Sequence, residues 1–145
     1  EIAAVASPAG PVLVRGVTTG PDSRLTVANT LIHEYLHSMR DTREYASLTP
    51  AERRVEEGAV TAVTEDLSPR FECAVWRGCG PTGWLVFDAS GDRYSRWAAM
   101  VRGVSRRATG RPVTSPQARA WRYQLVRADR AARAVMWARA TGVMR

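Results

Sequence analysis

The chain has only two histidines, and both lie in one pentapeptide, His33-Glu34-Tyr35-Leu36-His37. Residues four apart in an α-helix lie on the same side of the helix, about one turn (~6 Å) apart along its axis. Two imidazoles in that relation can bind one zinc ion, and the neighbouring Glu34 can accept a proton from a zinc-bound water. The pattern therefore requires a helix and predicts a zinc site with His33 and His37 as ligands and Glu34 as general base.

The flanking sequence favours that helix. After the Gly20-Pro21 break, Asp22 or Ser23 can cap a helix start. Apolar residues then recur at helical spacing and give the helix a face to bury. We expect a helix over about residues 23–40.

A catalytic zinc site has three protein ligands and leaves the fourth position to water, so a third ligand is expected downstream. A strong helix start follows the motif: Thr49 as N-cap, Pro50 at the first helical position and Glu52 completing a capping box. We expect this helix to end before Pro69. The short connection, residues 41–48, suits two antiparallel helices packed as a hairpin.

Glu56 and Glu57 in this second helix point about 100° apart, so only one is expected to face the histidines. A glutamate in a second helix, one short connection after H-E-x-x-H, resembles the gluzincin group of zinc metallopeptidases. Glu57 follows His37 by twenty positions, as in thermolysin-like members, and Glu57-Gly58 is similar to the Glu-Gly of aminopeptidase-type members. Glu56 has the slightly shorter aminopeptidase-like spacing. We choose Glu57, because in those relatives the ligand immediately precedes the glycine; the alternative is a solvated face paired with neighbouring arginines.

The resemblance covers about residues 25–67 and implies metal-assisted hydrolysis of a peptide bond. Zinc would lower the pKa of its bound water to about 7, and Glu34 would pass the proton to the leaving amine. One position departs from the family pattern. Thermolysin-like enzymes place a carboxylate that orients a zinc-bound histidine four residues after the third ligand, and here that residue is Thr61. A hydroxyl, Glu65 or a backbone carbonyl would have to substitute.

The tetrahedral intermediate also needs a hydrogen-bond donor for its oxyanion. Related peptidases use a Tyr, His or Arg, and this chain has no third histidine. Tyr45 is our choice, because it lies in the connection between the two ligand helices. Tyr94 and Tyr123 are alternatives, and a packing role for Tyr45 in the hairpin connection carries equal weight.

The expected fold is α+β and helix-dominated, with the zincin-like helix hairpin, a small N-terminal β-sheet and two further C-terminal helices. A chain of 145 residues that is 45% hydrophobic can bury one core, so we expect a single metallopeptidase-like domain over residues 1–145, cut from a longer polypeptide. No apolar run approaches the ~20 residues needed to cross a membrane. The other expected elements are strands at Ile2 to Ala6, Val12 to Val17, Phe71 to Trp76 and Trp84 to Phe87, and helices at about 92–108 and 115–141.

Charge is distributed unevenly along the chain, and all 21 basic residues are Arg. Residues 102–145 carry eleven Arg and one acid (+10), and residues 1–101 carry ten Arg and thirteen acids (−3), which together give +7. The basic C-terminal part, residues 102–145, could bind nucleic acid, an acidic partner or an anionic membrane. We favour arginines spread over solvated helix faces, because no nucleic-acid-binding motif accompanies them.

Cys73 and Cys79 are six residues apart and could close a disulfide, which would favour a secreted or translocated protein; two buried thiols are the alternative.

Three functions follow: a zinc endopeptidase acting on protein or peptide substrates, a zincin-fold structural or interaction module with little turnover, and an Arg-rich nucleic-acid-binding domain. Retention of Glu34 favours the first, because a structural site has no use for a base.

Overall fold

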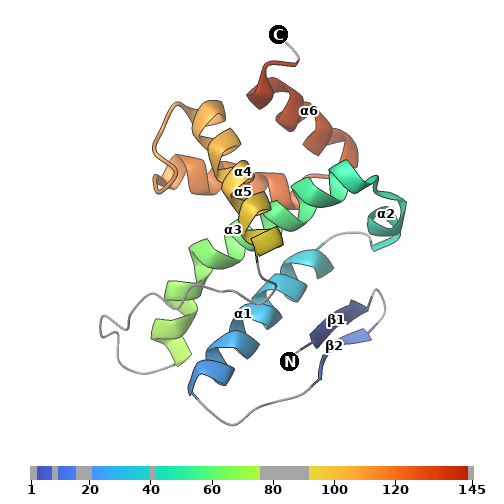
Figure 1. Cartoon of the computed structure of the whole chain (residues 1–145), viewed down its shortest axis with the longest axis vertical. Coiled ribbons are helices and arrows are strands. Elements are labelled where there is room, and N and C mark those ends of the chain that lie inside the picture. The colour runs from blue at the N-terminus through green and yellow to red at the C-terminus, as the bar shows by residue number, and fades with distance from the viewer. Residues whose placement is uncertain (1–2, 8–9, 16–20, 40–41, 76–91, 144–145) are drawn as a thin grey trace.

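The computed structural model describes residues 3–7, 10–15, 21–39, 42–75 and 92–143 (Figure 1). Its elements, in chain order, are β1 (Ala3–Ser7), β2 (Gly10–Arg15), α1 (Pro21–Ser38), α2 (Thr42–Ser47), α3 (Pro50–Val75), α4 (Asp92–Thr109), α5 (Pro116–Arg127) and α6 (Arg130–Thr141).

The 26-residue helix α3 is the centre of the fold and contacts α1, α4 and α5 (Figure 1). Its middle turns carry small and β-branched residues that are almost completely buried. They pack against side chains from all three neighbouring helices, and burial of this apolar surface is the main favourable term in assembling the helices. The buried core consists of Ile32 and Leu36 from α1, Ala59, Val60 and Val63 from α3, Val101 from α4, and Leu125 and Val126 from α5.

The predicted helix pair is confirmed: α1 and α3 pack against each other in antiparallel directions. Near one end, the Ser68 hydroxyl contacts the Asn29 side chain, and near the other end His37 contacts Glu57. The predicted capping box also forms. The backbone N–H of Thr49 donates to Glu52 Oε2 at 2.7 Å, and the N–H of Glu52 donates to Thr49 Oγ1 at 3.3 Å.

The predicted end of α3 before Pro69 is wrong, because the helix continues to Val75 with the proline inside it. A proline removes one helical hydrogen bond, and tertiary contacts can outweigh that loss. Here the preceding residue, Ser68, is buried against Asn29 of α1, which holds this turn in place. The strand predicted from Phe71 is therefore wrong as well, and its predicted partner, Trp84 to Phe87, lies outside the described residues.

The α+β fold class is corrected: the described fold is helical, and no β-sheet forms a layer of it in the described ranges. The two N-terminal segments pair only with each other, as an antiparallel ribbon with Ala4 opposite Val14 and Val5 opposite Leu13. The ribbon contacts α1. Two strands are too few for a sheet that is stable by itself, and the other predicted strand that the structure describes is helical. The expected small N-terminal β-sheet is thus reduced to one hairpin beside a helical core.

The third predicted helix is confirmed as α4, but the predicted long C-terminal helix is wrong because it is split into α5 and α6. Ala128 adopts an extended conformation, and the carboxylate of Asp129 accepts a hydrogen bond from Ala132 N at 2.8 Å. Asp129 therefore caps a new helix, as short polar side chains do. Among the residues of these two helices, Arg122 and Arg133 are buried, and Ala132 and Val135 are exposed.

Acidic side chains of α3 pair with arginines of the three C-terminal helices. The pairs are Glu52 with Arg130, Glu56 with Arg133, Glu65 with Arg102, and Asp66 with Arg122. The Arg122 side chain is completely buried and also donates to the Ser105 hydroxyl at 3.0 Å. The interpretation of the arginines as solvated residues is therefore wrong for Arg122 and Arg133.

In the helices that the structure describes, none combines the length and apolarity needed to span a membrane. The proposed Cys73–Cys79 bond lies outside the residues whose side chains are described.

Gly58 sets how closely α3 and α4 approach. A Cβ atom built on Gly58 would lie 2.6 Å from the carbonyl oxygen of Trp97, whereas one on Gly103 would meet nothing within 4 Å. Alanine is intrinsically better than glycine inside a helix by about 1 kcal/mol.

We expect Gly58→Ala to lower the free energy of unfolding by about 1–3 kcal/mol, because the two helices must separate. Gly103→Ala, the matched control, should raise it by about 0.5–1 kcal/mol. Urea denaturation of both variants checks this, and equal effects at the two sites would show that the helices do not approach closely at Gly58.

Candidate metal centre

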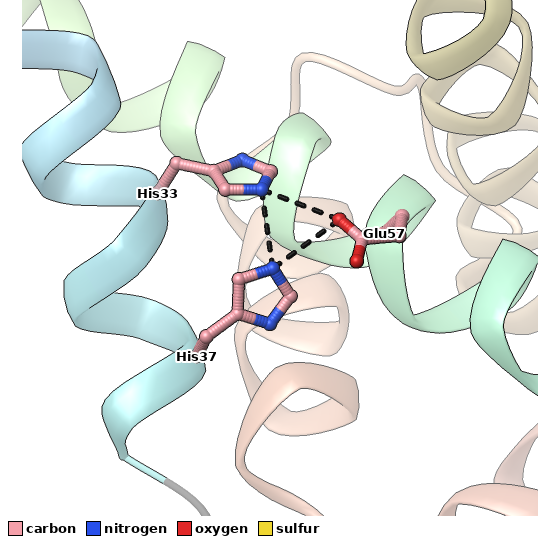
Figure 2. A group of neighbouring side chains, drawn as sticks. All are labelled: His33, His37 and Glu57. Atoms are coloured by element: carbon pink, nitrogen blue, oxygen red, sulfur yellow. Dashed lines mark hydrogen bonds and ion pairs between the residues drawn. The ribbon is translucent and has the colours of Figure 1, made fainter. Parts of the chain in front are cut away.

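Three side chains from α1 and α3 converge on one point (Figure 2). His33 and His37 lie one turn apart on α1, and Glu57 lies near the start of α3. The two Nε2 atoms are 3.1 Å apart, and Glu57 Oε2 lies 3.3 Å from the Nε2 of His33 and 3.2 Å from that of His37. The structure therefore brings together the three residues predicted to bind the metal.

The spacing of these atoms fits a tetrahedral zinc ion. Ligand distances of about 2.0–2.1 Å in an ideal tetrahedron place any two ligand atoms about 3.3–3.4 Å apart. The three observed separations lie within a few tenths of an ångström of that value. A fourth position would remain for a ligand that is not part of this triad.

Hydrogen bonding alone satisfies this triangle poorly. Each neutral imidazole carries one N–H, and a carboxylate only accepts. If both Nε2 atoms are protonated, two N–H groups face each other across 3.1 Å; if only one is, a single proton must serve two contacts. A shared cation would satisfy all three atoms at once.

Glu57 is buried in its charged form. Burial raises the pKa of this carboxyl, but hydrogen bonds with His33 and His37, the charge of His37 and a hydrogen bond from Tyr45 outweigh it and hold the pKa well below its usual range. Metal ligands must be deprotonated. Glu57 therefore meets that requirement at neutral pH.

Tyr45 reaches the centre from α2. Its hydroxyl donates a hydrogen bond to Glu57 Oε1, the oxygen that does not face the histidines, and its ring lies edge-on to that of His37 with centroids 5.6 Å apart. Burial and the Glu57 contact raise the pKa of Tyr45 far above its usual value, so the hydroxyl stays a donor. The residue is nevertheless 39% exposed, so part of it faces solvent beside the centre.

The other two candidate tyrosines are placed differently. The ring of Tyr94, on α4, lies edge-on to that of His33 with centroids 6.3 Å apart. Tyr123 lies on α5, where its ring is beneath the guanidinium of Arg127 at 5.8 Å. Tyr94 therefore remains beside the centre, and Tyr123 shows no contact with the triad in the described ranges.

Glu34 follows His33 on α1 and is partly buried. Its carboxylate is not among the three converging ligand atoms.

Glu56 has a role that the sequence interpretation missed. The prediction that only one of the two glutamates can face the histidines is wrong, because Glu56 Oε1 lies 3.4 Å from His37 Nδ1 while Glu57 contacts Nε2. The two nitrogens lie on different sides of the imidazole ring, so adjacent positions on α3 can reach one ring from two sides. The adjacent acids were visible in the sequence, but the partner of Glu56, Arg133, lies 77 positions further along the chain.

Neither of the two side chains suggested as substitutes for the orienting carboxylate of thermolysin-like enzymes contacts a histidine among the described residues. The Thr61 hydroxyl is buried and has no hydrogen-bond partner in the part of the chain that the structure describes. Glu65 pairs with Arg102 of α4.

Two imidazoles and one carboxylate form a donor set found in catalytic zinc sites. Comparison with known proteins identifies no matching protein family, no matching curated protein and no matching solved structure.

Proposed function

We propose that this protein is a zinc-dependent peptidase that hydrolyses internal peptide bonds. The observation that carries the proposal is the convergence of His33, His37 and Glu57 at tetrahedral spacing, beside a glutamate placed as in H-E-x-x-H. A bound zinc ion would supply an acidified water molecule and polarise the scissile carbonyl.

The protein's own residues supply the remaining chemistry. His33, His37 and Glu57 hold the ion, and the low pKa of Glu57 keeps that carboxylate charged. Glu34 accepts the proton of the attacking water and delivers it to the leaving amine. Tyr45 donates a hydrogen bond to the oxyanion, which requires its hydroxyl to turn from Glu57 towards the substrate.

The two alternative functions explain fewer of the observed features than the peptidase proposal does. A structural zinc module would explain the three ligands and give no role to Glu34. A nucleic-acid-binding domain would use exposed arginines of the C-terminal helices, and four arginines of that region already pair with acids of α3. The peptidase proposal gives a role to His33, Glu34 and His37 together.

We expect the purified protein to contain about one zinc ion per chain, the number that one three-ligand site holds. His37→Ala and Glu57→Gln should remove it, because two protein ligands hold zinc weakly. Tyr35→Phe, a control inside the same pentapeptide, should retain it, because Tyr35 is well exposed to solvent. Metal analysis of the folded variants checks this. A wild-type protein that neither contains zinc nor takes it up would refute the proposed site.

The Glu34→Gln variant should keep its zinc. Its rate of peptide cleavage should fall by about 10²–10⁴-fold, the usual contribution of a general base. A panel of unfolded proteins, analysed by mass spectrometry for new termini, provides the assay. Equal cleavage by the two proteins would remove Glu34 from the mechanism, and cleavage by neither would favour the structural module.

For Tyr45→Phe, we expect unchanged zinc content and a kcat lowered by about 10²–10³-fold, as for the loss of one oxyanion donor. Zinc titration and steady-state kinetics at saturating zinc separate the two effects. Weaker zinc binding with an unchanged kcat would instead mean that Tyr45 acts by holding Glu57.

A further inference from the structure

His37 is held through both of its ring nitrogens. Its Nε2 faces His33 and Glu57, and its Nδ1 lies 3.4 Å from Glu56 Oε1, an ion-pair distance a little beyond the usual range of about 2.7–3.2 Å for an N–H···O hydrogen bond. The Glu56 side chain is only 1% exposed, so its charge is removed from water. A buried carboxylate requires partners, and the structure supplies one from the far end of the chain.

That partner is Arg133 of α6. Its Nη1 donates to Glu56 Oε2, and its Nη2 donates to the backbone carbonyl of Ala128 at 2.9 Å. Ala128 is the C-cap residue that follows α5, and its extended conformation leaves this carbonyl outside the helical ladder. The break between α5 and α6 thus provides the second anchor for the guanidinium that holds Glu56.

Each ring nitrogen of His37 faces a carboxylate, so in the metal-free protein Glu56 and Glu57 compete for the proton of the neutral ring. A metal ion held at Nε2 would leave that proton on Nδ1, facing Glu56. With Nδ1–H donating to Glu56, the lone pair of the neutral ring lies on Nε2, the atom that faces His33 and Glu57. A carboxylate behind a metal-binding histidine fixes its tautomer and orientation and raises its basicity.

We propose that Glu56, held by Arg133, is the positioning residue of the metal centre and fixes His37 with its Nε2 lone pair towards the metal. This rests on the proposed function in so far as a metal binds there. The hold of Glu56 on His37 is itself a property of the metal-free protein.

The same helix offers a matched control. Glu52 lies one turn before Glu56 and also pairs with an arginine of α6, with its Oε1 2.6 Å from Arg130 Nε. The Glu52 side chain makes no contact with the histidines in the described ranges. Glu52→Gln keeps the capping-box pattern, so it removes a charged pair between α3 and α6 without changing the surroundings of His37.

The experiment compares wild type, Glu56→Gln and Glu52→Gln in two measurements. The first is zinc affinity by competition with a chromogenic chelator. The second is the tautomer of His37 in the metal-free proteins, from the ¹⁵N shifts of the ring nitrogens well above the ordinary imidazole pKa of about 6.5. We expect Glu56→Gln to bind zinc about 10–100-fold more weakly and to carry a smaller fraction of the Nδ1–H tautomer than wild type, because Glu57 then faces Nε2 without a competing carboxylate at Nδ1. Glu52→Gln should match wild type in both measurements.

A folded Glu56→Gln protein with wild-type affinity and a wild-type tautomer would overturn the proposal and leave the metal site intact. If wild type binds no zinc, the proposed function fails, and the tautomer measurement alone decides whether Glu56 positions His37. Should Glu56→Gln not fold because it strands Arg133, the double variant Glu56→Gln/Arg133→Met replaces the buried ion pair with neutral side chains. The same losses are expected from it, and wild-type behaviour would again overturn the proposal.

Discussion

The placement of α3 against three other helices is the constraint on which the rest of the structure depends. Glu57 Oε2 lies 3.2–3.3 Å from two imidazole nitrogens on α1, yet the two helices are separate segments of the chain. Burial of the middle turns of α3 fixes its rotation and depth, and contact between Gly58 and the backbone of Trp97 fixes its distance from α4. Gly58, which follows the proposed ligand Glu57, is therefore required by helix packing. This requirement is independent of the resemblance to the Glu-Gly pair of aminopeptidase-type enzymes.

Buried charge makes the two halves of the chain dependent on each other. Glu56 is almost completely buried, and removing one partner from such an ion pair costs about 3–5 kcal/mol. Its arginine comes from α6, and the other pairs of α3 use arginines from α4, α5 and α6. The basic character of the C-terminal half thus matches the acidic character of α3. The H-E-x-x-H segment supplies two of the three converging side chains, and the C-terminal helices hold α3, which supplies the third.

Where a structural requirement is local, the sequence predicted it. The spacing of His33 and His37 requires a helix, and Thr49 with Glu52 marks a helix start whatever surrounds them. Glu57 was chosen over Glu56 because it precedes a glycine, as the third ligand does in the enzymes that the motif resembles, and it does lie against both histidines. Predictions failed where distant contacts decide the outcome. Pro69 predicted a helix end, but the helix continues through it because Ser68 packs on α1. The N-terminal segments have strand-like patterns, yet no third strand is available among the described residues to make a sheet of them.

The break between α5 and α6 shows how a local detail acquires a role at a distance. Asp129 is an ordinary N-cap residue, and the apolar spacing around it is compatible with one continuous helix. Because the chain instead ends one helix at Ala128 and begins another, a backbone carbonyl is left outside the ladder and accepts a hydrogen bond from Arg133. In a continuous helix that carbonyl would accept the hydrogen bond of Ala132. The guanidinium would then lose one of the two acceptors that orient it towards Glu56. The geometry at His37 therefore depends on a helix cap more than ninety residues further along the chain.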